Sequence, residues 1–402
     1  MKSEPFEDSI VIEQAKAAAL QVLLHNAKGP FENLPRTAAW GYPEPYTRDL
    51  MIAALGILVS NNDYLMHVLQ RVLKKLALNQ SRHGHIPSLA HDPEDRGASD
   101  TTPLFLLIAG LYRKVTRQTD FLDVAIEKAL VWMDYQSPDD RVIVGQLPTS
   151  DWRDEHWVLG YGLYVNAIVY SYLRLYGFNK KAHVLKQTMC QHTIESEIKK
   201  QHSHEGFVIR RRFHLAVWSY KVLRDERCDL LGNSLALLAG ITSATRARNF
   251  VAWVEHQCAV LRAKRQLACA LPPCLFPYIQ PDQPDWRPRY KKYNQPGHYH
   301  NGGVWPFICA FYTAAIVAAG KTKLAQEKLA ALARLVQIRH NPKLSFGFNE
   351  WLTAQDGVAR GQDWQTWSAG MFLYAARAVE SNSTPFFDTI REWPHSNTQD
   401  IN

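Results

Sequence analysis

Residues 46–59 read YTRDLMIAALGILV, a polar cluster followed at once by an apolar run. The apolar side chains of residues 50–59 recur at the three-to-four spacing of an α-helix, and the run is too long for a strand. Similar runs recur along the chain, whereas alternating Val- and Ile-rich strand patterns are nearly absent. The sequence therefore predicts an all-α protein. The other runs are residues 65–78, 104–115, 121–133, 163–176, 230–238, 252–261, 304–319, 324–336 and 367–379.

A polar cluster stands in front of every second predicted helix. Beyond residues 46–49, these clusters are residues 97–100, 150–154, 229, 300–303 and 361–365. Successive clusters are roughly 50 to 75 residues apart, which leaves room for an inner helix, a return helix and two loops. Six such hairpins predict an (α/α)6 barrel, a six-hairpin toroid. The N-termini of its inner helices converge at one end, so the clusters are expected to line a pocket there.

An ordinary explanation of these clusters is helix capping. Asp, Ser and Asn accept a hydrogen bond from the first backbone N–H groups of a helix. Capping explains Asp49 or Asp100 taken alone. It explains poorly why Trp, Arg, Gln and His crowd the same positions, because these residues are weak caps and are costly to half-bury without a function.

The chain of 402 residues shows no Pro-, Gly- or Ser-rich linker and no block of like charge. We therefore expect residues 1–402 to form a single catalytic domain. Within it, residues 1–35 are expected to be an N-terminal helical segment and residues 382–402 an irregular tail. An apolar share of 46%, with 12 Trp, 17 Tyr and 16 Phe, supplies a large core and leaves aromatic rings for stacking on sugars.

The formal charge of +8 does not indicate a nucleic-acid partner, because the basic residues are dispersed and the densest run, Arg210 to Arg212, is short. The N-terminal segment MKSEPFEDSI is unlike a secretory signal, and no apolar run is long enough to cross a bilayer. We expect a cytoplasmic protein without a membrane partner. A homo-oligomer is left open.

Six cysteines lie along the chain without a CxxC pair or a His/Cys spacing that suits zinc. We interpret all six as buried thiols and expect neither a metal nor a cofactor. The cysteines are Cys190, Cys228, Cys258, Cys269, Cys274 and Cys309.

Hydrolysis of an acetal needs one carboxylic acid and one carboxylate on opposite sides of the bond. Residues 149–157, TSDWRDEHW, offer the acid, because a neighbouring Trp can raise the pKa of a carboxyl by desolvation. A neighbouring Arg lowers that pKa, so the acid should be whichever of Asp151 and Asp154 points away from Arg153. The alternative is that both form surface salt bridges with Arg153 and His156.

The second carboxylate is expected in residues 346–352, FGFNEWL, which are followed by GQDWQTW at residues 361–367. Glu350 lies between aromatic residues in a glycine-containing loop, an unusual place for a glutamate that serves only solubility. A general-base function fits this setting better.

Three segments together resemble the alkaline and neutral invertases, glycoside hydrolase family 100. They are residues 299–306 (YHNGGVWP), 349–351 (NEW) and 362–368 (QDWQTWS). The upstream Arg48-Asp49 and Ser99-Asp100 look like pocket segments of the same family, so the resemblance spans about residues 40 to 380.

The resemblance implies a metal-free, inverting, exo-acting hydrolase of the (α/α)6 fold that splits sucrose into glucose and fructose. It places Glu350 as the general base and Asp154 as the general acid. Several donors and acceptors that converge on one sugar would give specificity. The implied substrate-binding residues are Tyr46, Arg48, Asp49, Asp100, Trp152, His300, Asn301, Trp305, Trp351, Gln362, Trp364 and Gln365.

One segment departs from the family pattern. Residues 162–166, GLYVN, stand where the invertases carry a Pro-Leu-Glu-type segment. This change keeps hydrolysis as the predicted reaction and leaves open an amylo-α-1,6-glucosidase or another α-glucosidase or disaccharidase on the same barrel.

Two other classes remain as alternatives. A sugar epimerase or isomerase could use histidines such as His83, His85, His156 and His300 as acid and base. A non-catalytic helical-repeat binding protein would show a fixed short repeat, which the uneven intervals between the clusters do not.

Overall fold

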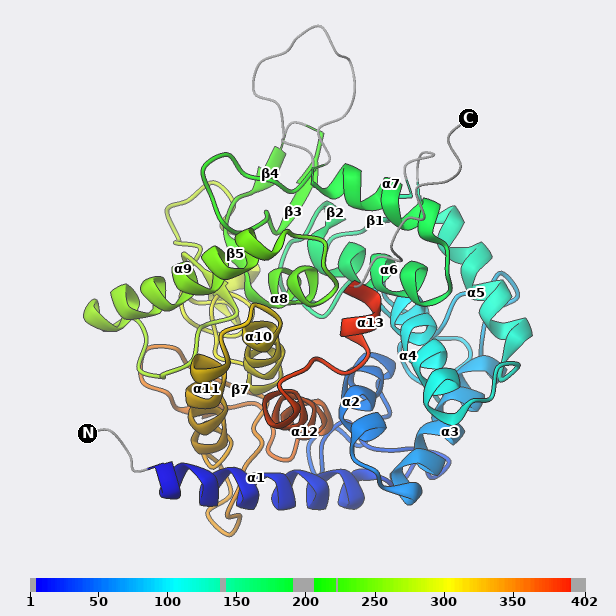
Figure 1. The fold of residues 1–402 in the computed structure, drawn as a ribbon, viewed down its shortest axis with the longest axis horizontal. Helices are drawn as coiled ribbons and strands as arrows, with labels where there is room; N and C mark the ends of the chain where they lie inside the picture. The colour runs from blue at the N-terminus through cyan, green and yellow to red at the C-terminus, as the bar shows by residue number, and fades with distance from the viewer. Residues whose placement is uncertain (1–4, 138–141, 191–205, 222, 392–402) are drawn as a thin grey trace, which may run out of the picture.

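A computed structural model describes residues 5–137, 142–190, 206–221 and 223–391 (Figure 1). Six inner helices form a closed ring, because each contacts the next and the last contacts the first. The ring confirms the predicted (α/α)6 barrel. Its helices are α2 (Thr47–Val59), α4 (Thr101–Thr116), α6 (Leu163–Leu175), α8 (Leu230–Leu238), α10 (Pro306–Ala318) and α12 (Thr366–Ser381).

The outer helices surround this ring (Figure 1). Five of them follow inner helices in the sequence, whereas the sixth is the N-terminal helix α1, which packs against α11 and α12. Asn26 at the end of α1 donates to the Thr366 hydroxyl at the start of α12 over 2.9 Å. The outer helices are α1 (Pro5–Asn26), α3 (Asp63–Leu78), α5 (Asp123–Tyr135), α7 (Asn179–Met189), α9 (Ala244–Ala263) and α11 (Thr322–Leu335).

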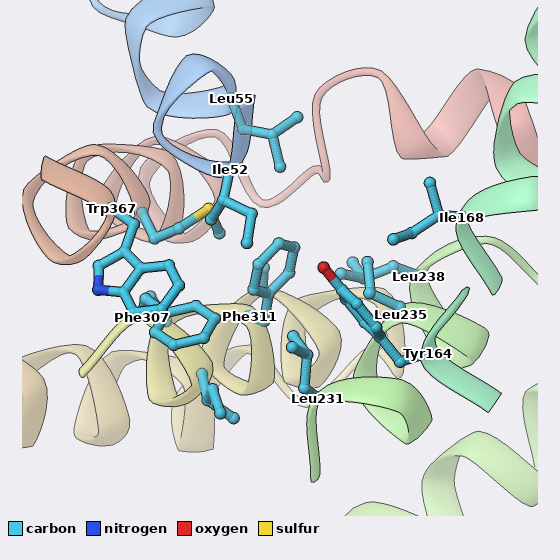
Figure 2. Packing of buried hydrophobic residues seen from close by; sticks show 14 of the residues in the cluster. Ile52, Leu55, Tyr164, Ile168, Leu231, Leu235, Leu238, Phe307, Phe311 and Trp367 are labelled. Carbon is cyan, nitrogen blue, oxygen red and sulfur yellow. The ribbon is translucent and has the colours of Figure 1, made fainter. Parts of the chain in front are cut away.

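The inner and outer helices differ in their pattern of apolar residues, because the inner helices bury a larger fraction of their surface. Every residue of α10 from Pro306 to Val317 is buried, as expected for a helix with neighbours on all sides. In α3, the buried positions Leu65, Val68, Leu69 and Val72 form one apolar stripe. Figure 2 shows the interior of the ring, where Ile52, Phe311 and Leu235 from α2, α10 and α8 meet.

Two glycines allow the first and last inner helices to approach closely. A β-carbon on Gly56 of α2 would lie 1.8 Å from the carbonyl oxygen of Gly370 on α12. Only glycine fits this crossing, since the contact atom belongs to the backbone and cannot move aside. The ring therefore closes by direct backbone contact.

Short antiparallel strands, which the sequence pattern did not predict, brace the loops in front of the inner helices. β1 (Gly145–Gln146), β2 (Gly160–Gly162), β3 (Trp218–Tyr220) and β4 (Leu223–Asp225) form one sheet. Gly160–Gly162 is a strand, and the helix expected over residues 163–176 begins at Leu163 directly after it. Two further pairs are β5 (Cys228–Asp229) with β6 (Leu275–Phe276) and β7 (Trp351–Leu352) with β8 (Ala359–Arg360), and a 3-10 turn, η1, spans Pro288–Lys291.

The end of the chain is more ordered than expected. Residues 382–402 were expected to be irregular, but α13 (Phe387–Arg391) packs against α6 and α8 with Phe387 and Ile390 buried. Residues 392–402 lie outside the described part. Cys190 is exposed, in contrast to the expectation that all six thiols are buried. Among the described residues, no helix is long and apolar enough to span a membrane.

Candidate active site

The N-terminal ends of the inner helices meet at one face, and an ion pair links the first two. Arg48 in the first turn of α2 donates to Asp100, the residue before α4, over 2.5 Å from Nε and 3.0 Å from Nη2. The Tyr164 hydroxyl from α6 donates to the same carboxylate over 3.2 Å. Asp100 is fully buried. This bidentate geometry fixes the direction of the guanidinium across three helices.

A second buried arginine holds the loop that carries Asp154. The Arg153 side chain donates to Asp151 over 2.7 Å from Nη2 and to Asp229 over 2.8 Å from Nη1. The backbone N–H of Arg153 also donates to Asp151, over 2.8 Å. Asp229 accepts in addition from Leu231 N and so caps α8. We call Arg153, Asp151 and Asp229 the arginine clamp.

The clamp distinguishes the two candidate acids, Asp151 and Asp154, by its effect on their pKa values. Burial alone would raise the pKa of Asp151, but the adjacent Arg153 guanidinium outweighs it and holds that pKa well below its usual range. An ionised carboxylate in this position cannot deliver a proton. Asp154 is not part of the clamp, so the criterion that the acid points away from Arg153 favours Asp154.

Asp154 lies at the mouth of the site. Its side chain is 62% accessible, and its Oδ1 lies 3.9 Å from His300 Nε2. The surrounding walls nevertheless raise its pKa by desolvation, and the positive charge of Arg48 offsets only part of this effect. His300 is not an ionic partner, because burial lowers its pKa well below the usual value and keeps the ring neutral. Such a carboxyl can hold a proton for a leaving group.

Glu350 lies deeper and is only 7% exposed. Burial, together with the charges of Asp49 and Asp154, raises its pKa to about 8. Among the described residues, the one hydrogen bond that the Glu350 carboxylate accepts is weak and comes from the backbone N–H of Gln362 to Oε2 over 3.3 Å. The backbone N–H of Glu350 also donates a hydrogen bond to the carbonyl of Gln362 over 3.0 Å. The β7–β8 hairpin thus sets the position of this side chain.

Asp49 is the third carboxyl of the site. Burial raises its pKa to about 7 against the opposing charge of Arg48, and Asp100 and Asp154 raise it further. The pKa of Asp49 therefore responds to the charge of Asp154, and the pKa of Glu350 responds to the charges of both Asp49 and Asp154. Carboxyls that interact in this way titrate together, and their protons belong to the group rather than to one residue.

Two tyrosines that the sequence analysis did not select lie among these carboxyls. Glu350, burial and the charges of Asp154 and Asp49 raise the pKa of Tyr42 to about 12. Burial and the charges of Asp154 and Glu350 raise the pKa of Tyr299 well above its usual value. Tyr299 directly precedes the His300 motif and could have been selected on that ground. Tyr42 lies in a loop without a helix signal.

Aromatic rings form one wall of the site. His300 is stacked between Tyr299, at a centroid distance of 4.0 Å, and Trp305, at 5.6 Å. Trp152 is buried and meets the His300 ring edge-on at 5.0 Å. Trp351 stacks at 6.4 Å on Trp305, whose indole donates to Tyr299 O.

Three other predicted binding residues, Asn301, Gln365 and Trp364, differ in their hydrogen bonding and packing. Asn301 uses its amide on backbone groups, accepting from Ile279 N and donating to the carbonyls of Ile279 and Asn294. Gln365 precedes α12, and its Oε1 is buried without a hydrogen-bond partner among the described residues. Trp364 packs against Trp40 at 5.2 Å and against His25 at 5.0 Å.

Two further predicted residues lie at the edge of the site. Tyr46 precedes α2 and is partly exposed. The Gln362 side chain packs against Gly41, where a β-carbon would lie 1.9 Å from its amide carbon.

Comparison with known proteins bears out the resemblance that the sequence suggested. The family model for alkaline and neutral invertases matches residues 186–382. This range contains Glu350 and the His300 motif but not Asp154 or Arg48. Alkaline/neutral invertase C, mitochondrial, from Arabidopsis thaliana is 26% identical over 165 residues, 39% of this chain and 22% of that protein. Cytosolic invertase 1 from Oryza sativa subsp. japonica is 24% identical over 168 residues, 40% of this chain and 27% of that protein.

The aligned part of the chain thus spans about a quarter of the length of these invertases. Solved structures share the fold over a larger range. The GH63 mannosylglycerate hydrolase from Thermus thermophilus superposes with a TM-score of 0.61 at 16% identity, over 89% of this chain and 99% of that one. A glycosidase variant in complex with glucose gives 0.64 at 14% identity, over 94% and 99%. The family match and the invertase relatives support a glycosidase.

Proposed function

We propose that this protein is an inverting, exo-acting glycoside hydrolase that cleaves sucrose or a closely related glucoside. The observation that carries the proposal is the pair Asp154 and Glu350. These carboxyls come from loops far apart in the sequence, both have raised pKa values, and the charge of Asp154 contributes to the raised pKa of Glu350. Two carboxyls that share a site in this way are what acetal hydrolysis requires.

In the proposed reaction, Asp154 donates its proton to the glycosidic oxygen as the bond to the anomeric carbon breaks. Glu350 removes a proton from a water that attacks the anomeric carbon from the opposite face. The configuration therefore inverts. An inverting pair leaves space for this water, so we predict a separation of roughly 6.5 to 9.5 Å between the two carboxyl groups with substrate bound.

The raised pKa values fit this assignment if the two groups share one proton. With a pKa of about 8, Glu350 in the empty site is mostly protonated at neutral pH. The productive state carries the proton on Asp154 and the charge on Glu350, and coupled carboxyls exchange these states readily. Loss of the last shared proton at higher pH would remove the acid.

The surrounding groups suit a neutral sugar. Arg48 and Asp49 offer a charged donor and an acceptor at one side, held in place by Asp100, and the partly exposed ring of Trp351, backed by Trp305, offers an apolar face at another. Hydroxyl groups that bind such fixed partners are recognised individually, because an analogue without one leaves a buried group unpaired. We further propose a cytoplasmic location, since one relative is named a cytosolic invertase, although another is named mitochondrial.

The test uses anomer-resolved NMR of sucrose incubated with wild type, Asp154→Asn and Glu350→Gln. Wild type should release glucose of inverted configuration together with fructose, and both variants should be inactive. Azide should restore turnover to Glu350→Gln with a glucosyl fluoride as substrate, because a small anion needs no base to attack. Asp154→Asn should keep activity on that fluoride, because its leaving group needs no acid.

Absence of sucrose cleavage by wild type would rule out this substrate. Isomaltosides, trehalose and glucosylglycerate would then be tested as substrates of the same carboxyl pair. Activity that survives both substitutions would overturn the proposed site.

A further inference from the structure

A second cleft lies outside the group of three carboxyls, between the loop before α4, the end of α5 and strand β1. It has a volume of about 500 Å³, within the size range of small-molecule sites. Asp49, Asp154 and Glu350 do not line it. Its lining includes His85, Ser99, Trp132, Gln136, Gln146 and Ser150.

The chemistry of this lining suits a neutral, hydroxyl-rich ligand. Two amides and three hydroxyls supply hydrogen-bonding groups, and Trp132 supplies an aromatic surface. Within the described part of the chain, Arg96 is the one side chain with a permanent charge in the lining. His85 contacts the Trp132 ring at 5.1 Å, and burial lowers the pKa of its imidazole. Among the residues that the structure describes, the lining contains no carboxyl.

Gln146 links the cleft to the arginine clamp. Its side chain is 8% exposed, and its Nε2 donates to Asp151 of the arginine clamp over 3.1 Å. Its Oε1 has no hydrogen-bond partner among the described residues. This oxygen is buried against Gly162 and has almost no surface open to the cleft, so the contribution of Gln146 is the bond from Nε2 that joins the cleft lining to the arginine clamp.

Two residues of the cleft lining directly precede residues that position the candidate active site. They are Ser99 and Ser150, which are joined by a hydroxyl contact of 2.8 Å and a backbone bond of 2.6 Å. The residues that follow them are Asp100, which holds Arg48, and Asp151, which belongs to the clamp. The cleft thus adjoins the residues that position the site without containing any reacting group.

We propose that this cleft is a second carbohydrate site that binds a single hexose without cleaving it. The choice of a hexose rests on the proposed function, whereas the site itself does not require hydrolysis. Because Gln146 lines the cleft and donates to Asp151, a ligand that packs against the Gln146 side chain restrains this bond. Occupancy of the cleft would therefore stiffen the arginine clamp beside Asp154.

The test follows the indole N–H resonance of Trp132 in protein labelled with ¹⁵N at tryptophan. Trp132→Phe, or Trp132→Tyr, identifies the resonance by its loss. D-Glucose and D-fructose are titrated into wild type and into Glu350→Gln, which leaves the cleft intact. We expect a saturable shift with a dissociation constant on the order of 1 mM in both proteins.

Two variants on α5 and its C-terminal end distinguish specific binding from a general effect. Gln136→Leu should weaken the binding several-fold, because it removes an amide from the lining. Tyr135→Ala is the matched control, since Tyr135 is the adjacent residue, is 74% exposed and does not line the cleft. This control should bind hexose as wild type does.

Three results would overturn the proposal. They are no shift of the Trp132 resonance, a shift that grows without saturation and equally with glycerol, and a shift with glucose 6-phosphate alone. The last result would assign the cleft to an anion held by Arg96. A saturable hexose shift in a protein that hydrolyses no sugar would refute the proposed function and leave the second site standing.

Discussion

Gly361 provides the space in which the carboxylate of Glu350 lies. A β-carbon on Gly361 would be 2.0 Å from Glu350 Oε2, and the residue has a φ of +70° that L side chains rarely adopt. Gly361→Ala should therefore displace the carboxylate and lower kcat about 100-fold, as expected for a misplaced catalytic group. Steady-state kinetics on the substrate identified for wild type measure this loss.

Gly357 provides the control for backbone strain. It lies in the same hairpin with a φ of +69°, but the nearest atom to an added β-carbon is 3.6 Å away. Gly357→Ala should introduce the same kind of backbone strain as Gly361→Ala, about 1 kcal/mol of unfolding free energy, and leave kcat unchanged. Equal losses of kcat in both variants would assign the effect to the hairpin backbone instead of Glu350.

The arginine clamp should be needed for both stability and activity. Arg153→Met leaves Asp151 and Asp229 as buried carboxyls without their partner, which costs about 3–5 kcal/mol of unfolding free energy in comparable cases. Because Asp154 is the next residue, kcat should also fall under conditions where the variant is folded. Urea denaturation and kinetics measure the two effects separately.

Arg227 is a matched control for the clamp. It pairs with Asp225 and with the partly exposed Asp285. Asp225 is buried like the clamp carboxyls, so Arg227→Met should also lower the free energy of unfolding by about 3–5 kcal/mol, but it should leave kcat of the folded protein unchanged. If folded Arg153→Met also kept the kcat of wild type, the clamp would be structural only.

The pH profile should depend on Asp49. Activity requires one proton on the pair of Asp154 and Glu350, so it should fall as pH rises through the Glu350 pKa of about 8. Burial is the main cause of that value, and the negative charge of Asp49 adds to it. Asp49→Asn removes this charge and should move the upper limb to lower pH. Asp120→Asn changes an exposed carboxyl and should leave the high-pH side of the activity profile in place. An unchanged profile in Asp49→Asn would contradict the coupling between Asp49 and Glu350.

Glu350 should also reduce the stability of the protein in alkaline solution. Its pKa is about 8 when folded and about 4.3 in a model peptide, so the folded state binds the proton more tightly. Stability is then highest below the unfolded pKa and falls as pH rises from about 4.5 to 8. Glu350→Gln cannot lose a proton and should unfold at a higher temperature than wild type at pH 9. Thermal unfolding at pH 5 and pH 9 tests this, and an equal difference at both pH values would contradict it.

Local patterns were sufficient to predict the ring. The helices have the periodicity of buried α-helices, and the polar residues before α2, α4 and α12 stand directly at helix starts. The strands could not be predicted in the same way, because pairs of two or three residues are too short for a periodic signal. They form because distant loops meet, as Tyr161 does with Ser219.

The site was predicted less completely for a similar reason. The choice between Asp151 and Asp154 depends on Asp229, which lies 76 residues beyond Arg153 and turns its guanidinium inward. Tyr42 lies among the carboxyls because α1 and α2 bring its loop there, and its neighbours in the sequence give no sign of this. Which groups face each other is a property of the closed ring rather than of any segment.

The position of α1 has a consequence for the order in which the chain can fold. The sixth hairpin of the barrel joins the first helix to the last inner one, and Lys16 of α1 pairs with Glu380 at the end of α12. During synthesis, the apolar side of α1, with Ala15, Ala19 and Val22, has no partner until the distant helices α11 and α12 have been made. Ring closure is thus a late, long-range event, and such events are slow and leave apolar surface open to other chains. A circular permutant that begins at α2 and carries α1 after α12 would turn this step into a local one.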